Sequence, residues 1–301
     1  MAAQLRAVRQ RIRAVQSIAK ITRAQELIAS SRIIRAQQRM RSAEPYSREL
    51  SRAVEAVVSR SGSVTHPLTA EPESPRRAAV LVLTSDSGFC GAYNVNVLRE
   101  TQRLRRLLAD RGLETASYVV GRKGVGWHRF RGMEPEQVWT GFSARPEFRD
   151  ARAVTSALLD AFALPADEGG ADEIHIVCTE FISMLTQRPV VRRILPMEIE
   201  ERAGEPPAGP LPQYEFEPST EDVLDALLPR YVESRVFYSM LEAAACELAW
   251  RRRAMKAATD NAGDLVERLT REANNARQAE ITQEISEIVG GANALAEANR
   301  E

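Results

Sequence analysis

The chain has 301 residues, enough for one large domain or two ordinary ones with a substantial hydrophobic core. Hydrophobic residues make up 44% and charged residues 27%, which is typical of globular proteins. The longest aliphatic run, AAVLVL at 78–83, is too short to cross a bilayer, and three scattered cysteines predict neither a disulfide framework nor a zinc site. The net charge is zero, but residues 1–60 hold 13 Lys or Arg and four Glu, a net of +9.

Residues 1–60 are predicted to form one long helix. Apolar residues recur there every three or four positions, first at Leu5, Val8, Ile12 and Val15 and then, one short step later, at Ile18, Ile21, Gln25 and Ile28. Pro45 predicts a bend or break in this helix. Residues 61–77 contain three prolines and few apolar residues, which indicates a linker.

Residues 78–197 change period and predict a central α/β domain. Short β-branched runs, AAVLVLTSD, ETASYVVG, EIHIVCTEF and RPVVRRILPM, are typical of buried strands. Helical patterns lie between them at about 94–110, 121–131 and 147–163. This alternation predicts an open, Rossmann-like α/β sheet, closed by a loop rich in Pro and Glu at 198–219.

Residues 220–301 return to helix, with Pro229 expected to separate a short helix from a much longer one. The long helix carries one apolar seam at Ala262, Leu265, Leu269 and Ala276, and a second at Ile281, Ile285, Ile288, Ala292 and Leu295. Residues 260–301 have a net charge of −5, opposite in sign to the first helix. We therefore expect the two terminal helices to form an antiparallel coiled coil flanking the α/β domain.

Polar residues interrupt the apolar stripe between these two seams, at Asn274, Asn275, Arg277 and Gln278. One hypothesis is a solvated face of the coiled coil. The other is a polar contact to a partner that encloses the helices. The pattern alone leaves both open.

No motif for catalysis, a cofactor or a metal is complete. The stretch LTSDSGFCGAYN at 83–94 resembles a nucleotide loop but lacks the spacing of phosphate-binding motifs, so a structural turn with Asn94 capping the next helix is expected. GRKGVG at 121–126 is compatible with an anion cradle or with a basic helix start. The three histidines are isolated, and the carboxylates at strand ends, Asp86, Asp172, Glu173 and Glu180, are expected to be solvated. A basic coiled-coil adaptor for nucleic acid and an α/β enzyme with helical arms are the alternatives.

Three blocks, in this order and spacing, resemble the gamma chain of the F-type ATP synthase, most closely those of actinobacteria. They are RIRAVQSIAKITRAQELIASSRIIRAQ near the start, TSDSGFCGAYN in the middle and MKAATDNAGDLVERLTREANNARQAEITQEISEIVGGANAL at the end. The resemblance implies a non-catalytic rotor shaft. In that family the coiled coil stands inside a ring of alpha and beta subunits, and the α/β domain sits with the epsilon subunit on the membrane ring of c subunits.

The resemblance implies that proton-driven rotation of the c ring is coupled to conformational changes at the catalytic sites of beta. It also implies a peripheral position on the cytoplasmic side of the cell membrane, with membrane contact only through the c ring, and no cofactor or nucleic acid.

Matched to the family, the residues that contact beta are Arg277 and Gln278, which catch a loop, with Thr282 and Glu284 in the same coupling region, and Gln25 and Cys90 near an acidic lever segment. Four positions depart from the family pattern. Gln25 replaces a common Met, Ser87 a common basic residue, Asn275 a frequent Lys or Arg, and Glu280 a frequent small residue.

Overall fold

The computed structural model describes residues 2–61, 66, 68–197 and 220–298. The chain divides into two compact units, one of residues 1–28 with 252–301 and one of residues 29–251. Two long helices, α1 (Ala2–Ser61) and α5 (Thr220–Ala298), contribute to both units. The 198–219 loop and most of the linker's first half lie outside the described residues, so the predicted segment boundaries stay predictions.

Helix α1 runs through Pro45 and α5 through Pro229, which excludes a break at Pro45 and corrects the predicted separation of two helices at Pro229. A proline inside a helix removes one backbone hydrogen bond and costs about 3 kcal/mol. Here the neighbouring residues are buried: Leu50 follows Pro45, and Leu228 and Val232 flank Pro229. Their burial against the rest of the unit outweighs the loss of one bond, so the helical path continues.

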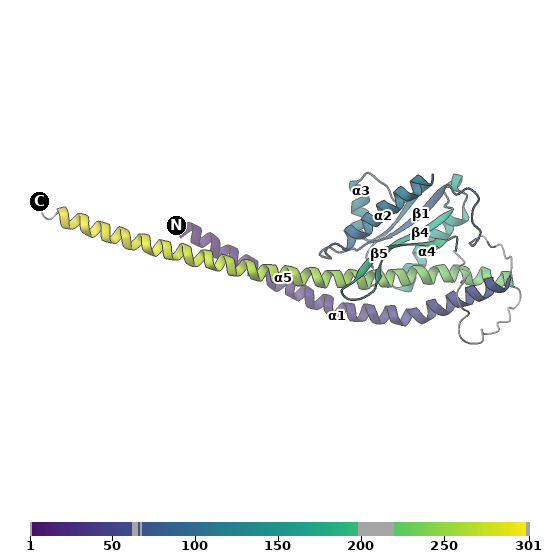
Figure 1. The fold of residues 1–301 in the computed structure, drawn as a ribbon, viewed down its shortest axis with the longest axis horizontal. Coiled ribbons are helices and arrows are strands. Elements are labelled where there is room, and N and C mark those ends of the chain that lie inside the picture. The colour runs from purple at the N-terminus through teal and green to yellow at the C-terminus, as the bar shows by residue number, and fades with distance from the viewer. Residues whose placement is uncertain (1, 62–65, 67, 198–219, 299–301) are drawn as a thin grey trace. The chain divides into compact units, whose positions relative to one another are not determined.

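The coiled-coil unit is an antiparallel pair made by the start of α1 and the end of α5, as predicted (Figure 1). Thr22 and Thr259 meet through their hydroxyls at 2.7 Å. The buried or partly buried seam advances in steps of three and four on both helices, which is the repeat of a coiled coil. Its members are Leu5, Val8, Ile12, Val15, Ala19 and Thr22 on α1 and Met255, Thr259, Ala262, Val266, Leu269 and Ala273 on α5.

The phase of the seam differs from the prediction. Ile18 and Ile21 are 53% and 62% exposed, because the seven-residue repeat continues through Ala19 and Thr22 instead. On α5 the repeat likewise reaches Ala273, which is buried. An unshifted repeat keeps one face of each helix against its partner, so the small residues at these positions occupy the seam and the isoleucines beside them do not.

The second predicted seam is not buried by α1. Ile281, Ile285 and Ile288 are 45%, 56% and 71% exposed in a part of α5 that extends past the first residues of α1 (Figure 1). Ala292 is also exposed, and the side chain of Leu295 lies outside the described ones. This apolar stripe therefore has no partner within the described residues.

The second unit is built on a five-stranded sheet of order β3-β2-β1-β4-β5. β1 (Arg77–Leu83), β2 (Glu114–Val120), β3 (Gln137–Trp139) and β4 (Glu173–Phe181) are parallel, and β5 (Gln187–Leu195) pairs antiparallel with β4. The predicted open α/β sheet is confirmed. The sequence prediction lacks β3, which has only three residues and no buried side chain.

Helices cover both faces of this sheet. α2 (Tyr93–Asp110) and Trp127 of α3 (Arg122–Phe130) pack on the face that carries Val80 and Val82. α4 (Phe148–Ala163) and α5 pack on the opposite face. A short 3-10 helix (Ala166–Glu168) precedes β4. The α5 helix thus serves as a core element of the sheet unit and as one strand of the coiled coil.

Candidate functional site

The end of α5 presents four of the predicted contact residues on neighbouring helical turns. Arg277, Gln278, Thr282 and Glu284 are all exposed. The Thr282 hydroxyl donates to the Gln278 carbonyl at 2.9 Å, so it is committed to the backbone of its own helix. Within the described part of the chain, the Arg277 and Gln278 side chains make no hydrogen bond or ion pair. They lie directly before the exposed isoleucines and form one polar and apolar surface with them.

Gln25 also belongs to the coiled-coil unit, and its side chain is exposed on α1. It lies three residues after Thr22, which contacts Thr259 of α5. Arg277 lies 18 residues after Thr259 along α5. At 1.5 Å per helical residue this is about 27 Å. The structure therefore does not bring Gln25 together with the Arg277 cluster.

Cys90 lies in the sheet unit and is buried, with only 3% of its surface exposed. Its thiol packs with Tyr93 and Cys246 and lies 3.1 Å from the Asn94 side-chain amide. Phe89 is the large exposed side chain of the same turn, and Ser87 is exposed as well. A partner approaching this turn would meet the phenyl ring, and the thiol faces inward.

The turn between β1 and α2 satisfies its polar groups internally. The Asn94 side chain accepts from the Ser85 N–H at 2.9 Å instead of capping α2, which corrects the predicted cap. The Asp86 carboxylate accepts from the N–H groups of Arg122, Gly141 and Ser143 at 2.8 to 3.1 Å. The start of α3, which the sequence offered as an anion cradle, thus already holds a carboxylate of this chain.

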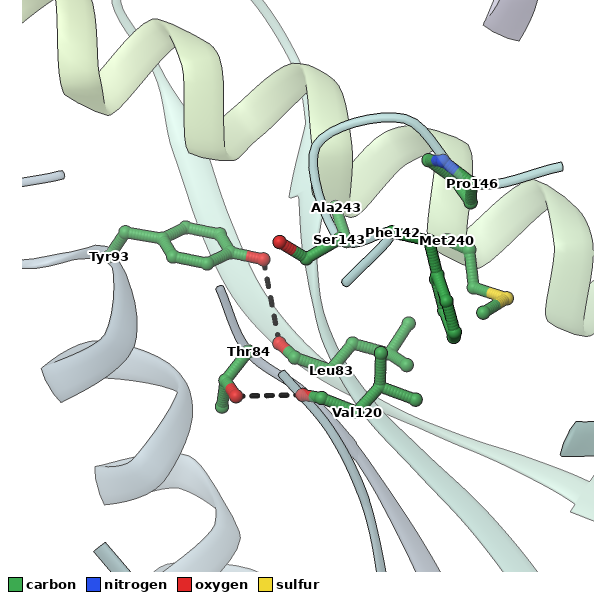
Figure 2. A pocket seen from close by; sticks show the side chains of 9 residues that line it. All are labelled: Leu83, Thr84, Tyr93, Val120, Phe142, Ser143, Pro146, Met240 and Ala243. Atoms are coloured by element: carbon green, nitrogen blue, oxygen red, sulfur yellow. Dashed lines mark hydrogen bonds between the residues drawn. The ribbon is translucent and has the colours of Figure 1, made fainter. Parts of the chain in front are cut away.

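A small cavity lies at the ends of β1 and β2, beneath α5 (Figure 2). The Tyr93 hydroxyl donates to the Leu83 carbonyl at 3.4 Å, and the Thr84 hydroxyl donates to the Val120 carbonyl at 2.7 Å. The cavity measures about 10 Å³, room for one water molecule at most. It cannot hold a nucleotide, which agrees with a structural turn.

Several carboxylates are buried in ion pairs, a feature that sequence reasoning missed. Glu173, expected to be solvated, is 1% exposed and accepts two hydrogen bonds from Arg111, at 2.5 and 3.2 Å. It also lies 2.8 Å from the imidazole of His175. Burial pushes the pKa of Glu173 up, but these hydrogen bonds outweigh it and hold the pKa below its ordinary value.

A second buried pair lies on α5. The Arg251 guanidinium donates to Glu247 at 2.7 Å, and the Glu247 side chain is 1% exposed. Burial raises the pKa of Glu247 despite the opposing effect of Arg251. The spacing of four residues on one helix face was a usable signal for this pair. Its burial was not visible, because charged helix residues are usually solvated.

The histidines make separate contacts. His128 lies 2.9 Å from the Gly124 carbonyl, and His66 lies 2.8 Å from Asp225. Among the described residues, no three His, Cys, Asp or Glu side chains are grouped as a metal site requires. None of the described helices combines the length and the apolar character needed to cross a membrane.

The sequence matches the ATP synthase family over residues 4–295. The ATP synthase gamma chain of Acidothermus cellulolyticus is 58% identical over 295 residues, covering 98% of both chains. The chain belongs to the ATP synthase gamma-chain family. The gamma chains of Frankia casuarinae and Streptomyces griseus are 58% and 54% identical over 98% or more of each chain. The resemblance to actinobacterial gamma chains is confirmed.

Solved structures share the gamma-chain fold. A chain of the Euglena gracilis mitochondrial ATP synthase (OSCP, F1 and c ring, rotational state 3) matches with a TM-score of 0.69 at 15% identity, covering 100% of this chain and 97% of that one. A chain of the Tetrahymena thermophila mitochondrial ATP synthase central stalk and c ring matches with a TM-score of 0.58 at 20% identity, covering 79% and 99%.

Gamma chains form the central rotor stalk of the F-type ATP synthase and are non-catalytic subunits. The function expected from the resemblance is confirmed at this level, in place of a nucleic-acid adaptor or an independent enzyme.

Proposed function

We propose that this gamma chain couples proton-driven rotation of the c ring to conformational changes at the catalytic sites of the beta subunits. The observation that carries this proposal is the change in α5 after Ala273. Upstream the seam is buried against α1, whereas every described side chain from 281 to 290 is exposed on a continuing helix. A stiff helix with an exposed apolar and polar surface suits a part that turns within surrounding subunits.

The residues proposed to contact beta on this surface are Arg277, Gln278, Thr282 and Glu284. Arg277 and Gln278 keep their donors available in the described part of the chain, so they can form hydrogen bonds with a loop of beta. A hydrogen bond contributes about 0.5–1.5 kcal/mol, or up to about 3 when one partner is charged. Contacts of that size favour one rotational position without preventing the next.

Gln25 and the turn that contains Cys90 are proposed to face the acidic lever segment of beta. Gln25 is exposed and offers an amide. Cys90 is buried, so its proposed role is to stabilise the conformation of the turn. We further propose the alpha subunits, the epsilon subunit and the c ring as partners, with the complex on the cytoplasmic face of the cell membrane. The solved structures of assembled rotors that share this fold support the pairing with F1 and c-ring subunits.

Reconstitution tests the proposal directly. The full chain alone should show no ATPase activity, and added with epsilon to an alpha–beta ring and membranes that carry the c ring it should restore ATP-driven proton pumping. Failure of the wild-type chain to restore pumping in an assembly that contains it would overturn the rotor assignment.

Gln278→Ala tests the proposed grip. We expect coupled turnover to fall about three- to tenfold, which corresponds to one lost polar contact. The matched control is Gln283→Ala, because Gln283 is exposed on the same helix but already donates to Glu287 at 2.9 Å. Circular dichroism should show equal helix content for both variants. Equal turnover for both would place the grip elsewhere.

A further inference from the structure

A groove of about 620 Å³ lies between α1, α5 and the start of α4, and is here called the α1–α4 groove. Its lining includes Arg35, Gln38, Arg39, Phe148, Phe237 and Leu241. All of the lining falls within residues 29–251, so the groove belongs to the sheet unit alone. Sites for small molecules typically measure about 300–1,000 Å³ and combine apolar walls with a few polar groups. The groove has that size and that mixture.

One wall of the groove is basic and has no partner of its own. Arg35 and Arg39 lie four residues apart on α1, which makes them neighbours on one helix face. Arg35 is exposed and Arg39 is half-buried, and neither guanidinium makes an ion pair or hydrogen bond with the part of the chain that the structure describes. Residues 29–43 hold four arginines and no acid, so α1 itself does not neutralise this wall.

The opposite wall of the groove is aromatic. The rings of Phe148, the first residue of α4, and Phe237 of α5 meet edge to face with their centroids 5.5 Å apart. Phe148 is 45% exposed, although Leu241, one turn after Phe237, is buried. The aromatic wall therefore leaves apolar surface in water that a bound ring would cover.

The one carboxylate of the lining is engaged elsewhere. The Glu147 carboxylate lies 3.2 Å from the Arg149 guanidinium, and the Glu147 N–H donates to the Asp150 carboxylate at 2.8 Å. Glu147 is thus held at the start of α4 and forms no ion pair with Arg35 or Arg39. The groove offers two uncompensated positive charges beside an aromatic surface.

We propose that the α1–α4 groove is a binding site for a small organic anion that joins a negatively charged group to an aromatic ring. Arg35 and Arg39 donate to the oxygens of the charged group, because the planar donor set of a guanidinium matches a carboxylate, sulfonate or phosphate. The ring packs against Phe148 and Phe237. Since the occupant contacts three helices at once, its binding stabilises the sheet unit. The inference is independent of the rotor proposal, because the isolated chain contains the whole site.

A fluorescent probe tests the basic wall. The dye anilinonaphthalene sulfonate, which joins an anionic group to aromatic rings, is titrated into the isolated full chain. We expect Arg39→Gln to weaken its binding about three- to tenfold. The matched control is Arg41→Gln, an exposed arginine of α1 outside the lining, which should bind like the wild-type chain. Dye bound to the exposed isoleucines of α5 would not respond to Arg39. Equal affinities of Arg39→Gln and wild type would overturn the inference.

An uncharged relative of the dye separates charge from packing. N-phenylnaphthylamine has the same rings without the sulfonate. It should bind about tenfold more weakly than the dye, and equally to the wild-type chain and to Arg39→Gln, because it carries no group for the arginine. A neutral compound that binds as tightly as the dye would show that the arginines do not select an anion, and would contradict the proposal.

A leucine substitution tests the aromatic wall. Phe148→Leu keeps an apolar side chain but removes the ring, so dye binding should weaken about threefold. Phe130→Leu is the matched control, because Phe130 is 88% exposed in the same unit but outside the groove. Circular dichroism should show equal helix content for both variants. Unchanged dye binding by Phe148→Leu would refute an aromatic ligand.

Competition identifies the source of the anion. ADP and naphthoate are each added to the isolated chain with dye bound. Displacement by ADP supports a nucleotide as ligand, and displacement by naphthoate supports an aromatic carboxylate. Displacement by neither would mean that the dye is adventitious. In the complex assembled with alpha, beta and epsilon subunits, the difference between wild type and Arg39→Gln should persist. Its disappearance there would make the groove a subunit contact and overturn the inference.

Discussion

At the scale of single residues, close contacts decide where this chain tolerates change. Gly124 lies in the first turn of α3 against the end of β1, where a Cβ atom would lie 2.7 Å from both the Thr84 hydroxyl and a methyl of Val119. The Gly124 N–H also donates to the Thr84 hydroxyl at 2.9 Å. Gly126, two residues later in the same helix, has open space around its Cα.

This difference predicts opposite effects for one substitution. Gly124→Ala should lower the free energy of unfolding by about 1–3 kcal/mol, because the helix start must move away from Thr84. Gly126→Ala should raise it by about 0.5–1 kcal/mol through a smaller loss of backbone entropy. Urea unfolding of the two variants checks this, and a loss at position 126 equal to that at 124 would contradict it.

The buried pair of Glu173 and His175, with the exposed Arg111 bonded to it, predicts a loss of stability in acid. Burial is the main cause that lowers the pKa of folded His175 below 6.5, with Arg193 and Arg111 adding to it and Glu173 opposing it. The unfolded chain therefore binds more protons once the pH drops below about 6.5, and the free energy of unfolding falls there. Glu173, whose folded pKa is held below 4.5, adds a further loss below that pH.

His175→Gln separates the two contributions. Glutamine can still donate to Glu173 but does not titrate. We expect a smaller slope of the unfolding free energy between about pH 6.5 and 5 than in the wild-type chain, with the loss below 4.5 retained. Denaturant unfolding as a function of pH measures both, and an equal slope would exclude His175 as the titrating group.

At the scale of elements, burial and not hydrophobicity separates the two apolar stripes of α5. Leu269 is 2% exposed in the seam, whereas Ile285 is 56% exposed beyond it. Leu269→Ala should cost about 2–5 kcal/mol in the isolated chain. Ile285→Ala should stay within about 0.5 kcal/mol. Thermal melting followed by circular dichroism compares them, and equal losses would show that the stripe after 281 is also buried.

The elements also show what sequence patterns can and cannot predict. The four longer strands were predictable because each contains a short apolar stretch with β-branched residues in it, while β3 has too few residues to carry a period. The helices were predictable, but the phase at Ile18 was not, since Ala19 and Thr22 fill the seam and large isoleucines face outward. Proline predicted helix breaks that do not occur. The burial of neighbouring side chains outweighs its local cost, and the sequence pattern does not show that burial.

The proposed contact residues were reached by resemblance and not by pattern. Arg277 and Gln278 are exposed, as a contact requires, but nothing in their spacing distinguishes them from solvated residues. The exposure of Phe89 was not predictable, because an aromatic residue beside a cysteine in a turn is equally consistent with a core position. Its backbone angle, which decides the direction of the ring, is a property of the folded turn.

At the scale of the whole molecule, the two units differ in how many of their side chains are buried. The coiled-coil unit encloses one narrow seam between two helices. The sheet has both of its faces covered, and the unit holds several ion pairs in which the carboxylate is buried. Few buried contacts mean a low free energy of local opening.

Hydrogen exchange should therefore distinguish the units in the isolated chain. We expect amides of residues 5–22 and 259–298 to exchange faster than those of β1, β2 and β4, with α5 showing a change in protection between the two parts. Mass spectrometry of peptic fragments measures this. Uniform protection along α5 would mean that the chain opens as one cooperative body.

The placement of prolines has a mechanical consequence. Both helix-internal prolines, Pro45 and Pro229, lie in the sheet unit, while residues 2–28 and 252–298 contain none. Each leaves a carbonyl one turn earlier without its usual donor, so bending costs least there. Under an applied load each helix should bend first near its own proline, and the proline-free stretches 2–28 and 252–298 should bend less.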